Sequence, residues 1–562
     1  MKKILSLLLA VLLLSSAALA AASVQAVPFP EMEYESLDAQ AVADEIAALT
    51  DMLEELDDPD DAYGLEAQAY RLYSHYDTMY TLSGIHYDMD GSDDYWYDEY
   101  SANSVGYAEV DAAYSDFYDA LELLEAGEEP EDAADDADYD GLIELYERES
   151  ELLAEYMRLL GTGTVEYGGE TLSYEGIYSM EDNDAYEEAM NLWLDAYNAP
   201  LAEIYVQLIE VRNAQAKLCG YDDYIDMAFE SQGYSYDADM VHALLDDIAE
   251  EAVPLFEELI ELGIKYYPEV ELGFDEYAGA LSALLRKLDR SFGRMWDFML
   301  ENELIYTQTG PYISPSVYST YLMDYSVPFI FSPFYGDAYS MSAILHEFGH
   351  SYSDSIIIIP QLDTSEVFSQ GLELLAANHY DEIFPEETAY EMRYDVAANV
   401  FMNCVACAET LFELQAYNME NPSVEKLNDL FAECDEIFKY YSIDMPREIS
   451  SRIWVAVSHI FEAPGYMIAY TVSADAALQL WEISLHDEER AVDLYLDMIY
   501  NSAEMPLTEN LHSLGLESIF DEGRVAGLTA FCKSVLLDEV LYEGEASVSP
   551  AGMLGMLGKM LF

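Results

Sequence analysis

Basic residues are scarce in this sequence. Its 562 residues include 21 Lys and Arg against 112 Asp and Glu, which gives a formal net charge of −91. Between Pro28 and Arg148 the only Lys or Arg is Arg71. Such a surface repels phosphate backbones and anionic lipid headgroups, so nucleic acids and membrane surfaces are disfavoured as partners. Two interpretations of the acidity remain: a strongly solvated exterior suited to a salty or cation-rich medium, or selection for basic peptide substrates.

Cysteine is also scarce. The five cysteines are Cys219, Cys404, Cys407, Cys434 and Cys532. An odd number at this low density does not indicate a disulfide scaffold. Cys404 and Cys407 have the spacing of a redox or metal pair, but no second pair accompanies them and their surroundings are helical in pattern. We therefore expect buried structural thiols.

Long apolar runs are missing from the sequence. No stretch reaches the roughly 18 uninterrupted apolar residues of a transmembrane helix. A shorter run, residues 4–14, follows Lys2 and Lys3 and precedes Ala-x-Ala-like sites that end at Ala20 and Ala26, the pattern of a secretory signal peptide. We therefore expect residues 1–26 to be a signal peptide. The mature protein is then secreted or extracellular, with no membrane insertion after signal removal.

Helical periodicity dominates the rest of the chain. Apolar residues recur at three- and four-residue steps in residues 41–56, 139–160, 186–219, 238–262 and 277–303. Chain breakers lie between these segments. With 52% hydrophobic residues the chain can bury a large core, so we expect a mainly α fold.

Two segments have the pattern of β-strands. Residues 164–174 predict a β-hairpin about a Gly-Gly turn. Residues 318–335 are rich in Tyr, Val, Ile and Phe and contain Pro328 and Pro333, so they predict one or two strands, with an edge strand favoured by the prolines. An edge strand just ahead of His346 is a natural place for an extended peptide to pair.

A candidate metal site lies at His346-Glu347-Phe348-Gly349-His350. On a helix, residues four apart share a face, so His346 and His350 can converge on one ion. Glu347 lies one step round and can meet a metal-bound water. This is the arrangement that a zinc hydrolase needs, with two imidazole ligands and a carboxylate that takes a proton. The alternative is a pair of histidines in the core of a buried helix.

The third ligand is expected to be a carboxylate on the following helix. Glu366 and Glu373 are seven residues apart and lie on about the same face, two turns apart. One can bind zinc while the other orients an imidazole, and spacing leaves both assignments open. Asp354 and Asp363 are weaker candidates, and His379 is expected to be structural or at the surface.

The motif HEFGH, followed by EVFSQGLE at residues 366–373, resembles the M3 metallopeptidases, which include thimet oligopeptidase and oligoendopeptidase F. Residues 211–221 are similar to that family's Arg-x-x-x-Ala-x-x-x-Gly-Tyr segment, and the Gly-Gly hairpin has a counterpart in the oligoendopeptidase F branch. The resemblance covers roughly residues 139–531. It implies Glu366 as the third ligand and Glu373 as a supporting carboxylate. The connection after His350 is shorter than the family's, so Glu373 stays a second choice.

Residues 459–470 resemble the family's His-then-Tyr segment. Tyr466 and Tyr470 are four apart and share a helical face. The resemblance implies that their phenols donate to the oxyanion of the transition state and that His459 contacts substrate, in the order of preference Tyr470, Tyr466, His459. With 48 Tyr in the chain, packing is the alternative role.

The expected protein is therefore a secreted zinc-dependent endopeptidase that hydrolyses oligopeptides, holds one Zn²⁺, uses Glu347 as general base and acid, and is a monomer. The resemblance implies a helical two-lobed peptidase with a deep cleft and a small β-sheet next to the HExxH helix. The expected regions are a helical N-terminal region (27–205), a catalytic region (206–545) and a C-terminal tail (546–562). Alternatives are a related exopeptidase of dipeptidase or carboxypeptidase type, a catalytically silent peptide-binding protein, and a cell-surface protein whose acidity is its function.

Overall fold

The computed structural model describes residues 27–56, 58–126, 139–178, 180, 182–261, 268–310, 312–357, 361–443 and 445–537. The expected signal peptide and C-terminal tail lie outside these residues. By its internal contacts the chain divides into two compact units. The first comprises Met1–Ala137 and Leu272–Ile358, and the second comprises Asp138–Glu271 and Ile359–Phe562.

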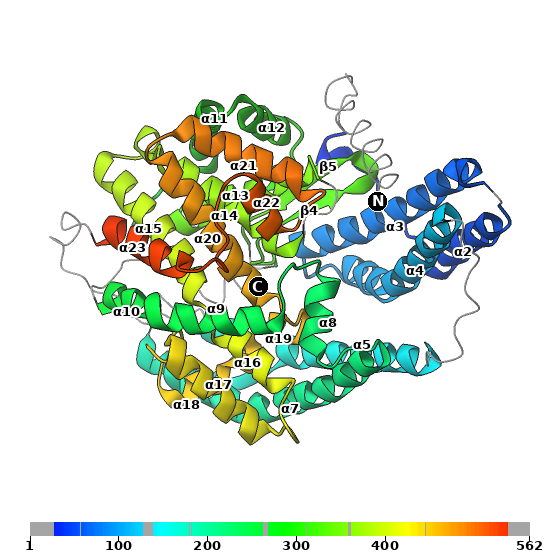
Figure 1. Cartoon of the computed structure of the whole chain (residues 1–562), viewed down its shortest axis with the longest axis horizontal. Coiled ribbons are helices and arrows are strands. Elements are labelled where there is room, and N and C mark those ends of the chain that lie inside the picture. Colours follow the sequence, from blue (N-terminus) through cyan, green and yellow to red (C-terminus); the bar gives the residue numbers. More distant parts are fainter. Residues whose placement is uncertain are drawn as a thin grey trace. The chain divides into compact units, whose positions relative to one another are not determined.

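The mainly α fold with small sheets is confirmed (Figure 1). In the first unit the helices are α2 (Ala39–Glu54), α3 (Tyr63–Met89), α4 (Asp94–Ala126), α11 (Phe274–Leu288), α12 (Arg290–Glu301) and α13 (Ala338–Asp354), with short 3-10 turns η1 (Phe29–Glu31), η2 (Pro59–Asp61) and η3 (Met323–Tyr325). Helices α2, α3 and α4 pack on one another around an apolar core that includes Ile46, Leu53, Ala69, Val110 and Phe117.

The expected helix over residues 277–303 is two helices. Asp289 is extended (φ −150°, ψ 147°) and ends α11, and its side chain accepts a hydrogen bond from the Ser291 backbone N–H (2.7 Å) as the N-cap of α12. An Asp that caps a new helix competes with continuation of the old one, because its carboxylate satisfies the first free N–H groups. Helical periodicity continues across such a break, so periodicity alone did not locate it.

A three-stranded sheet precedes α13 in the first unit. Its strands are β3 (Ile305–Tyr306), β4 (Tyr318–Leu322) and β5 (Val327–Phe331), in the order β3-β5-β4, and α13 packs on β4 and β5. The strand next to the HEFGH helix is therefore confirmed, and β4 is an edge strand.

Pro328, however, lies in the central strand β5, opposite Tyr321 of β4. The N–H groups of Ile330 and Ser332 donate toward β3, to Leu304 and Tyr306. By alternation the nitrogen of Pro328 points to the same side, beyond the end of the two-residue strand β3. A proline there removes no ladder hydrogen bond, so proline did not mark the edge strand in this sheet.

The second unit is also helical. Its helices are α5 (Tyr139–Thr162), α6 (Tyr174–Tyr178), α7 (Asn183–Leu218), α8 (Tyr224–Ser231), α9 (Ala238–Glu251), α10 (Val253–Glu261), α14 (Leu362–Ala377), α15 (Glu386–Val405), α16 (Ala408–Ala416), α17 (Val424–Phe438), α18 (Arg447–Ser450), α19 (Ser458–Glu462), α20 (Met467–Ser484), α21 (Glu488–Ser502), α22 (Leu507–Ser513) and α23 (Arg524–Leu536), with 3-10 turns η4 (Tyr380–Glu382) and η5 (Ile453–Ala456). Helix α14 packs along α20, and α5 packs along α7 (Figure 1).

The expected hairpin is confirmed as β1 (Thr164–Tyr167) and β2 (Glu170–Ser173), with Tyr167 opposite Glu170. Gly168 and Gly169 both have positive φ (62° and 93°), which a two-residue turn of this hand requires. The expected region boundary at 205–206 falls inside the continuous helix α7. The functional regions stay predictions.

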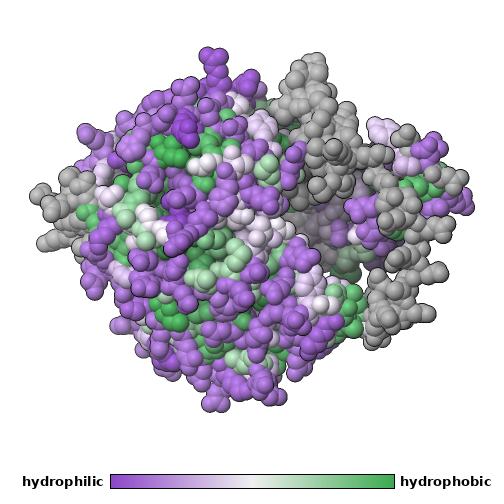
Figure 2. Space-filling view, in the orientation of Figure 1, coloured by the Kyte–Doolittle hydropathy of each residue, from purple (hydrophilic) through white to green (hydrophobic). Residues whose placement is uncertain are grey.

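Hydrophilic residues cover most of the face drawn in Figure 2, as the composition implies. Four of the five cysteines, namely Cys404, Cys407, Cys434 and Cys532, are buried free thiols, as expected, whereas Cys219 is exposed. In the described part of the chain, no helix combines the length and the apolarity needed to cross a bilayer.

Candidate metal centre

Helix α13 carries the HEFGH motif. It begins after Asp337, whose side chain accepts a hydrogen bond from the Ser340 backbone N–H (2.8 Å), a standard N-cap. Phe348 is fully buried and packs edge-to-face on Trp296 of α12, with ring centroids 5.2 Å apart. This apolar anchor fixes the rotation of the helix, so His346 and His350 lie half-buried on another of its faces.

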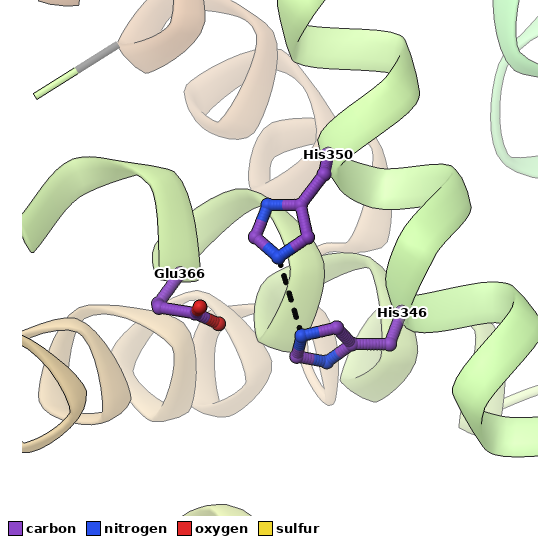
Figure 3. Close-up of side chains that lie close together, drawn as sticks. All are labelled: His346, His350 and Glu366. Atoms are coloured by element: carbon purple, nitrogen blue, oxygen red, sulfur yellow. Dashed lines mark hydrogen bonds between the residues drawn. The ribbon is translucent and has the colours of Figure 1, made fainter. Parts of the chain in front are cut away.

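The two imidazoles converge on one point (Figure 3). The Nε2 atoms of His346 and His350 are 3.2 Å apart, and the ring planes are inclined by 76°. Two ligands at a zinc–nitrogen distance of about 2.0–2.1 Å and a tetrahedral angle are about 3.3 Å apart. The pair therefore has the spacing of two ligands of one tetrahedral ion.

Glu366 of α14 completes the group. One ligand atom from each of His346, His350 and Glu366 lies within 4.8 Å of the other two, and Figure 3 shows the carboxylate turned toward the imidazoles. Two neutral nitrogens and one carboxylate oxygen form a donor set typical of catalytic zinc, which keeps a further position for water or substrate. The residues present therefore fit a zinc ion.

The other acidic candidates lie outside this group. Glu373 is buried two turns further along α14. Asp354 lies near His350, and burial raises its pKa to about 6. Asp363, at the start of α14, is fully buried, and its burial raises its pKa to about 7. His379 contacts Glu488 (Nε2 to Oε1, 2.5 Å), a structural partner.

Glu347, the candidate base, is buried next to the two histidines in sequence. Burial raises the pKa of the Tyr339 phenol on the same helix, and the nearby charge of Glu347 raises it further. A carboxylate in this low-dielectric setting interacts strongly with a proton on a neighbouring water.

The structure brings His459, Tyr466 and Tyr470 together. Their ring centroids are 4.9 Å (His459–Tyr466), 5.3 Å (Tyr466–Tyr470) and 6.3 Å (His459–Tyr470) apart. Helix α19 carries His459, while Tyr466 and Tyr470 lie at the start of α20. The three side chains are half-buried, and their rings are neighbours.

One supporting residue was missed. The Ser369 hydroxyl donates to Glu366 Oε2 (2.9 Å) from the next turn of α14. The spacing i, i+3 on a helix was a readable signal for this contact, since such residues are neighbours. A hydrogen bond from a buried serine limits the orientations open to the Glu366 carboxylate.

Comparisons with known proteins bear on the class of protein. Residues 29–131 match the family model described as Peptidase M3 N-terminal domain. This match precedes residues 139–531, where the motifs indicated similarity, so the likeness begins earlier than the motifs suggested. A search of the curated proteins finds no match.

Solved structures share the fold. An oligoendopeptidase F structure is 21% identical and covers 94% of this chain and 100% of its own, with a TM-score of 0.77. Pz peptidase A, solved with an inhibitor, is 20% identical and covers 90% of this chain and 99% of its own, with a TM-score of 0.75. An oligoendopeptidase F structure from Bacillus anthracis str. Ames is 18% identical and covers 91% of this chain and 98% of its own, with a TM-score of 0.70. The resemblance to the M3 peptidases is thus confirmed by the family match, and the solved structures show that the fold is shared.

Proposed function

We propose that this protein is a secreted zinc-dependent endopeptidase that hydrolyses oligopeptides. The observation that carries the proposal is the group formed by His346, His350 and Glu366, with Glu347 in the same helical turn as the two histidines. The M3 N-terminal domain and the M3-type fold support peptides as the substrate class.

His346, His350 and Glu366 would hold one zinc ion, which when bound supplies a Lewis acid that lowers the pKa of water to about 7 and polarises a carbonyl. His346 and His350 must be neutral at their donor nitrogens to serve as ligands, so metal affinity is expected to fall in acid.

Glu347 acts as general base and then as general acid. Its carboxylate takes a proton from the attacking water and later delivers it to the nitrogen of the departing amine. The same group serves both steps because it gains the proton in the first and loses it in the second. No covalent bond between enzyme and substrate is required.

Tyr470, Tyr466 and His459 are proposed to stabilise the transition state. Their phenols and imidazole can donate hydrogen bonds to the oxygen that becomes negative as the carbonyl is attacked. Their ring contacts favour one shared task for the cluster. We keep the order Tyr470, Tyr466, His459.

Export by the N-terminal signal, a monomeric state, a deep cleft and internal cleavage also belong to this proposal. The related exopeptidase differs only in the bond that is cut. A defined ten-residue peptide separates the two, because an endopeptidase releases internal fragments first and an exopeptidase releases an ordered ladder from one end.

The proposal is tested on the purified chain stripped with a chelator and titrated with zinc. Cleavage of a quenched fluorescent peptide should return in proportion to bound zinc and saturate at one ion per chain. A protein that binds zinc but never cleaves peptides would be a silent binder. A protein that neither binds zinc nor cleaves peptides would favour the third alternative, a cell-surface protein whose acidity is its function.

A further inference from the structure

The turn between α19 and α20 connects the three candidate transition-state residues. Helix α19 has only five residues, and Pro464 and Gly465 follow it before α20 begins. So short a helix has little stability of its own. The relative placement of His459 and Tyr466 must therefore come from groups outside the turn.

Three side chains from the same unit hold the backbone of this turn. The Arg212 Nη2 donates to the Phe461 carbonyl (2.5 Å), the Gln232 Nε2 donates to the Pro464 carbonyl (2.8 Å), and Glu413 Oε1 accepts from the Gly465 N–H (3.3 Å). We call Arg212, Gln232 and Glu413 the bracing residues. They come from α7, the end of α8 and α16, which are far apart in sequence.

Arg212 is itself held firmly. It is 1% exposed, and it also donates to Glu149 Oε1 (2.6 Å) and the Tyr417 hydroxyl (2.9 Å). The fork of a guanidinium fixes several acceptors in one geometry. Arg212 opens the Arg-x-x-x-Ala segment of residues 211–221, for which the proposed chemistry gives no role.

The turn is also closely packed on its buried side. Gly465 has φ +79°, and a Cβ there would lie 2.8 Å from Phe229 Cε1. Phe461, Pro464 and Gly465 are buried, whereas His459, Tyr466 and Tyr470 are half-buried. The turn is thus fixed on its buried side and presents the three rings on a more accessible one.

We propose that Arg212, Gln232 and Glu413 are positioning residues that set the placement of Tyr466 and Tyr470 through the backbone of the 459–466 turn. The inference rests on the proposed function for its effect on catalysis. Arg212 and Glu413 are buried, and all three bracing side chains bond to the backbone of the turn, so they would act on kcat through the tyrosines. A misplacement of about 1 Å in such a group can cost about 10²-fold in rate.

The test uses Gln232→Met, which keeps size, removes the donor to Pro464 and alters a half-buried side chain. The control is Gln479→Met at a turn without candidate residues, which removes two hydrogen bonds to the Glu517 backbone (Nε2 to the carbonyl, 3.0 Å, and the Glu517 N–H to Oε1, 3.0 Å) and is therefore the more disruptive change for the fold. Arg212→Met removes a buried guanidinium with three hydrogen-bond acceptors and endangers folding, so Gln232→Met carries the test.

For Gln232→Met we expect kcat to fall about tenfold with KM and zinc content unchanged, since orientation rather than binding is lost. In a Tyr466→Phe, Tyr470→Phe background the same substitution should lower kcat less than about twofold, because the groups it positions are gone. Gln479→Met should keep wild-type kcat. Equal losses in both backgrounds, or no loss in the first, would overturn the inference.

Hydrogen exchange tests the bracing apart from catalysis. The amides of residues 461–463, 465 and 466 should exchange faster in Gln232→Met than in the wild type and in Gln479→Met. Unchanged exchange would overturn the inference about the bracing residues. A wild-type chain that cleaves no peptide would refute the proposed function, and the exchange result would still decide whether the bracing exists.

Discussion

The proposed zinc site depends on two histidines of α13, His346 and His350, and on one of two carboxylates of α14, Glu366 or Glu373. A four-residue step on a helix specifies that His346 and His350 share a face, and their Nε2 atoms lie 3.2 Å apart. A seven-residue step places Glu366 and Glu373 on nearly the same face, so spacing could not choose between them. The group formed around the histidines includes Glu366.

Substitution of Glu366 and of Glu373 distinguishes the residue that binds zinc from the one that supports a ligand. Glu366→Ala should lose stoichiometric zinc, because it removes one of three protein donors. Glu373→Ala should weaken zinc by about 10–100-fold at most, the usual cost of losing an outer carboxylate. Competition with a chromophoric chelator measures both. The reverse order of affinities would make Glu373 the ligand.

The same contrast between spacing and position applies to the tyrosines. The sequence indicated that Tyr466 and Tyr470 share a helical face, and their rings are in contact. It did not indicate the buried side chains that hold the turn before them. Arg212 is 249 positions away in the sequence from Phe461, and Glu413 is 52 positions away from Gly465. No local sequence pattern encodes contacts over such separations.

At the scale of elements, the turn before α20 contains a glycine, Gly465, that has no room for a side chain. Gly465 and Gly515 have similar positive φ (+79° and +76°), but a Cβ would meet Phe229 only at Gly465. Alanine at either site carries the left-handed backbone cost of about 1 kcal/mol or somewhat more.

Gly465→Ala should therefore lower the free energy of unfolding clearly more than Gly515→Ala, since overpacking adds about 1–3 kcal/mol. Urea denaturation of the two variants gives the comparison directly. Equal midpoints would show that Phe229 moves aside freely and that the turn is less constrained than its contacts indicate.

Helix boundaries and strand order were only partly predictable at this scale. The periodicity of apolar residues predicted the helices, but it predicted one continuous helix over residues 277–303. In the structure Asp289 ends α11 and caps α12. The hairpin was readable because two glycines at a turn leave few alternatives. The order β3-β5-β4 was not, because it depends on a two-residue strand that no pattern marks.

At the scale of the whole molecule, charge of one sign dominates. A net charge of −91 repels itself, and dissolved salt screens that repulsion over about 10 Å at 0.1 M. Raising NaCl from about 0.05 to 1 M should therefore raise the urea midpoint of the metal-free protein. A midpoint that falls or stays constant would show that the acidic groups are spaced widely enough not to interact.

Buried carboxyl groups make the free energy of unfolding fall as pH rises. Burial raises the pKa of Glu409 to about 7 and that of Asp77 to about 6. Because these folded pKa values exceed the unfolded ones, the fold favours the protonated form. The resulting stability is complete below the unfolded pKa of about 4–4.5 and is lost as pH rises through about 6–7.

The metal-free protein should thus lose stability between about pH 4 and pH 7. Glu409→Gln removes one titrating group and should flatten that loss by about 2 kcal/mol. Exposed Asp116, replaced by Asn, serves as the control and should leave the pH profile unchanged. A profile that is flat in the wild type, or unaltered in Glu409→Gln, would contradict this account of the buried carboxyls.

The central claim is that the HEFGH segment is a catalytic zinc site for peptides. Its most direct test compares wild type with Glu347→Gln for bound zinc and for cleavage of a quenched peptide. We predict one zinc per chain in both and a loss of about 10³-fold or more in kcat for the variant, since the base is removed while the ligands remain. Cleavage by Glu347→Gln at near-wild-type rates would contradict the claim.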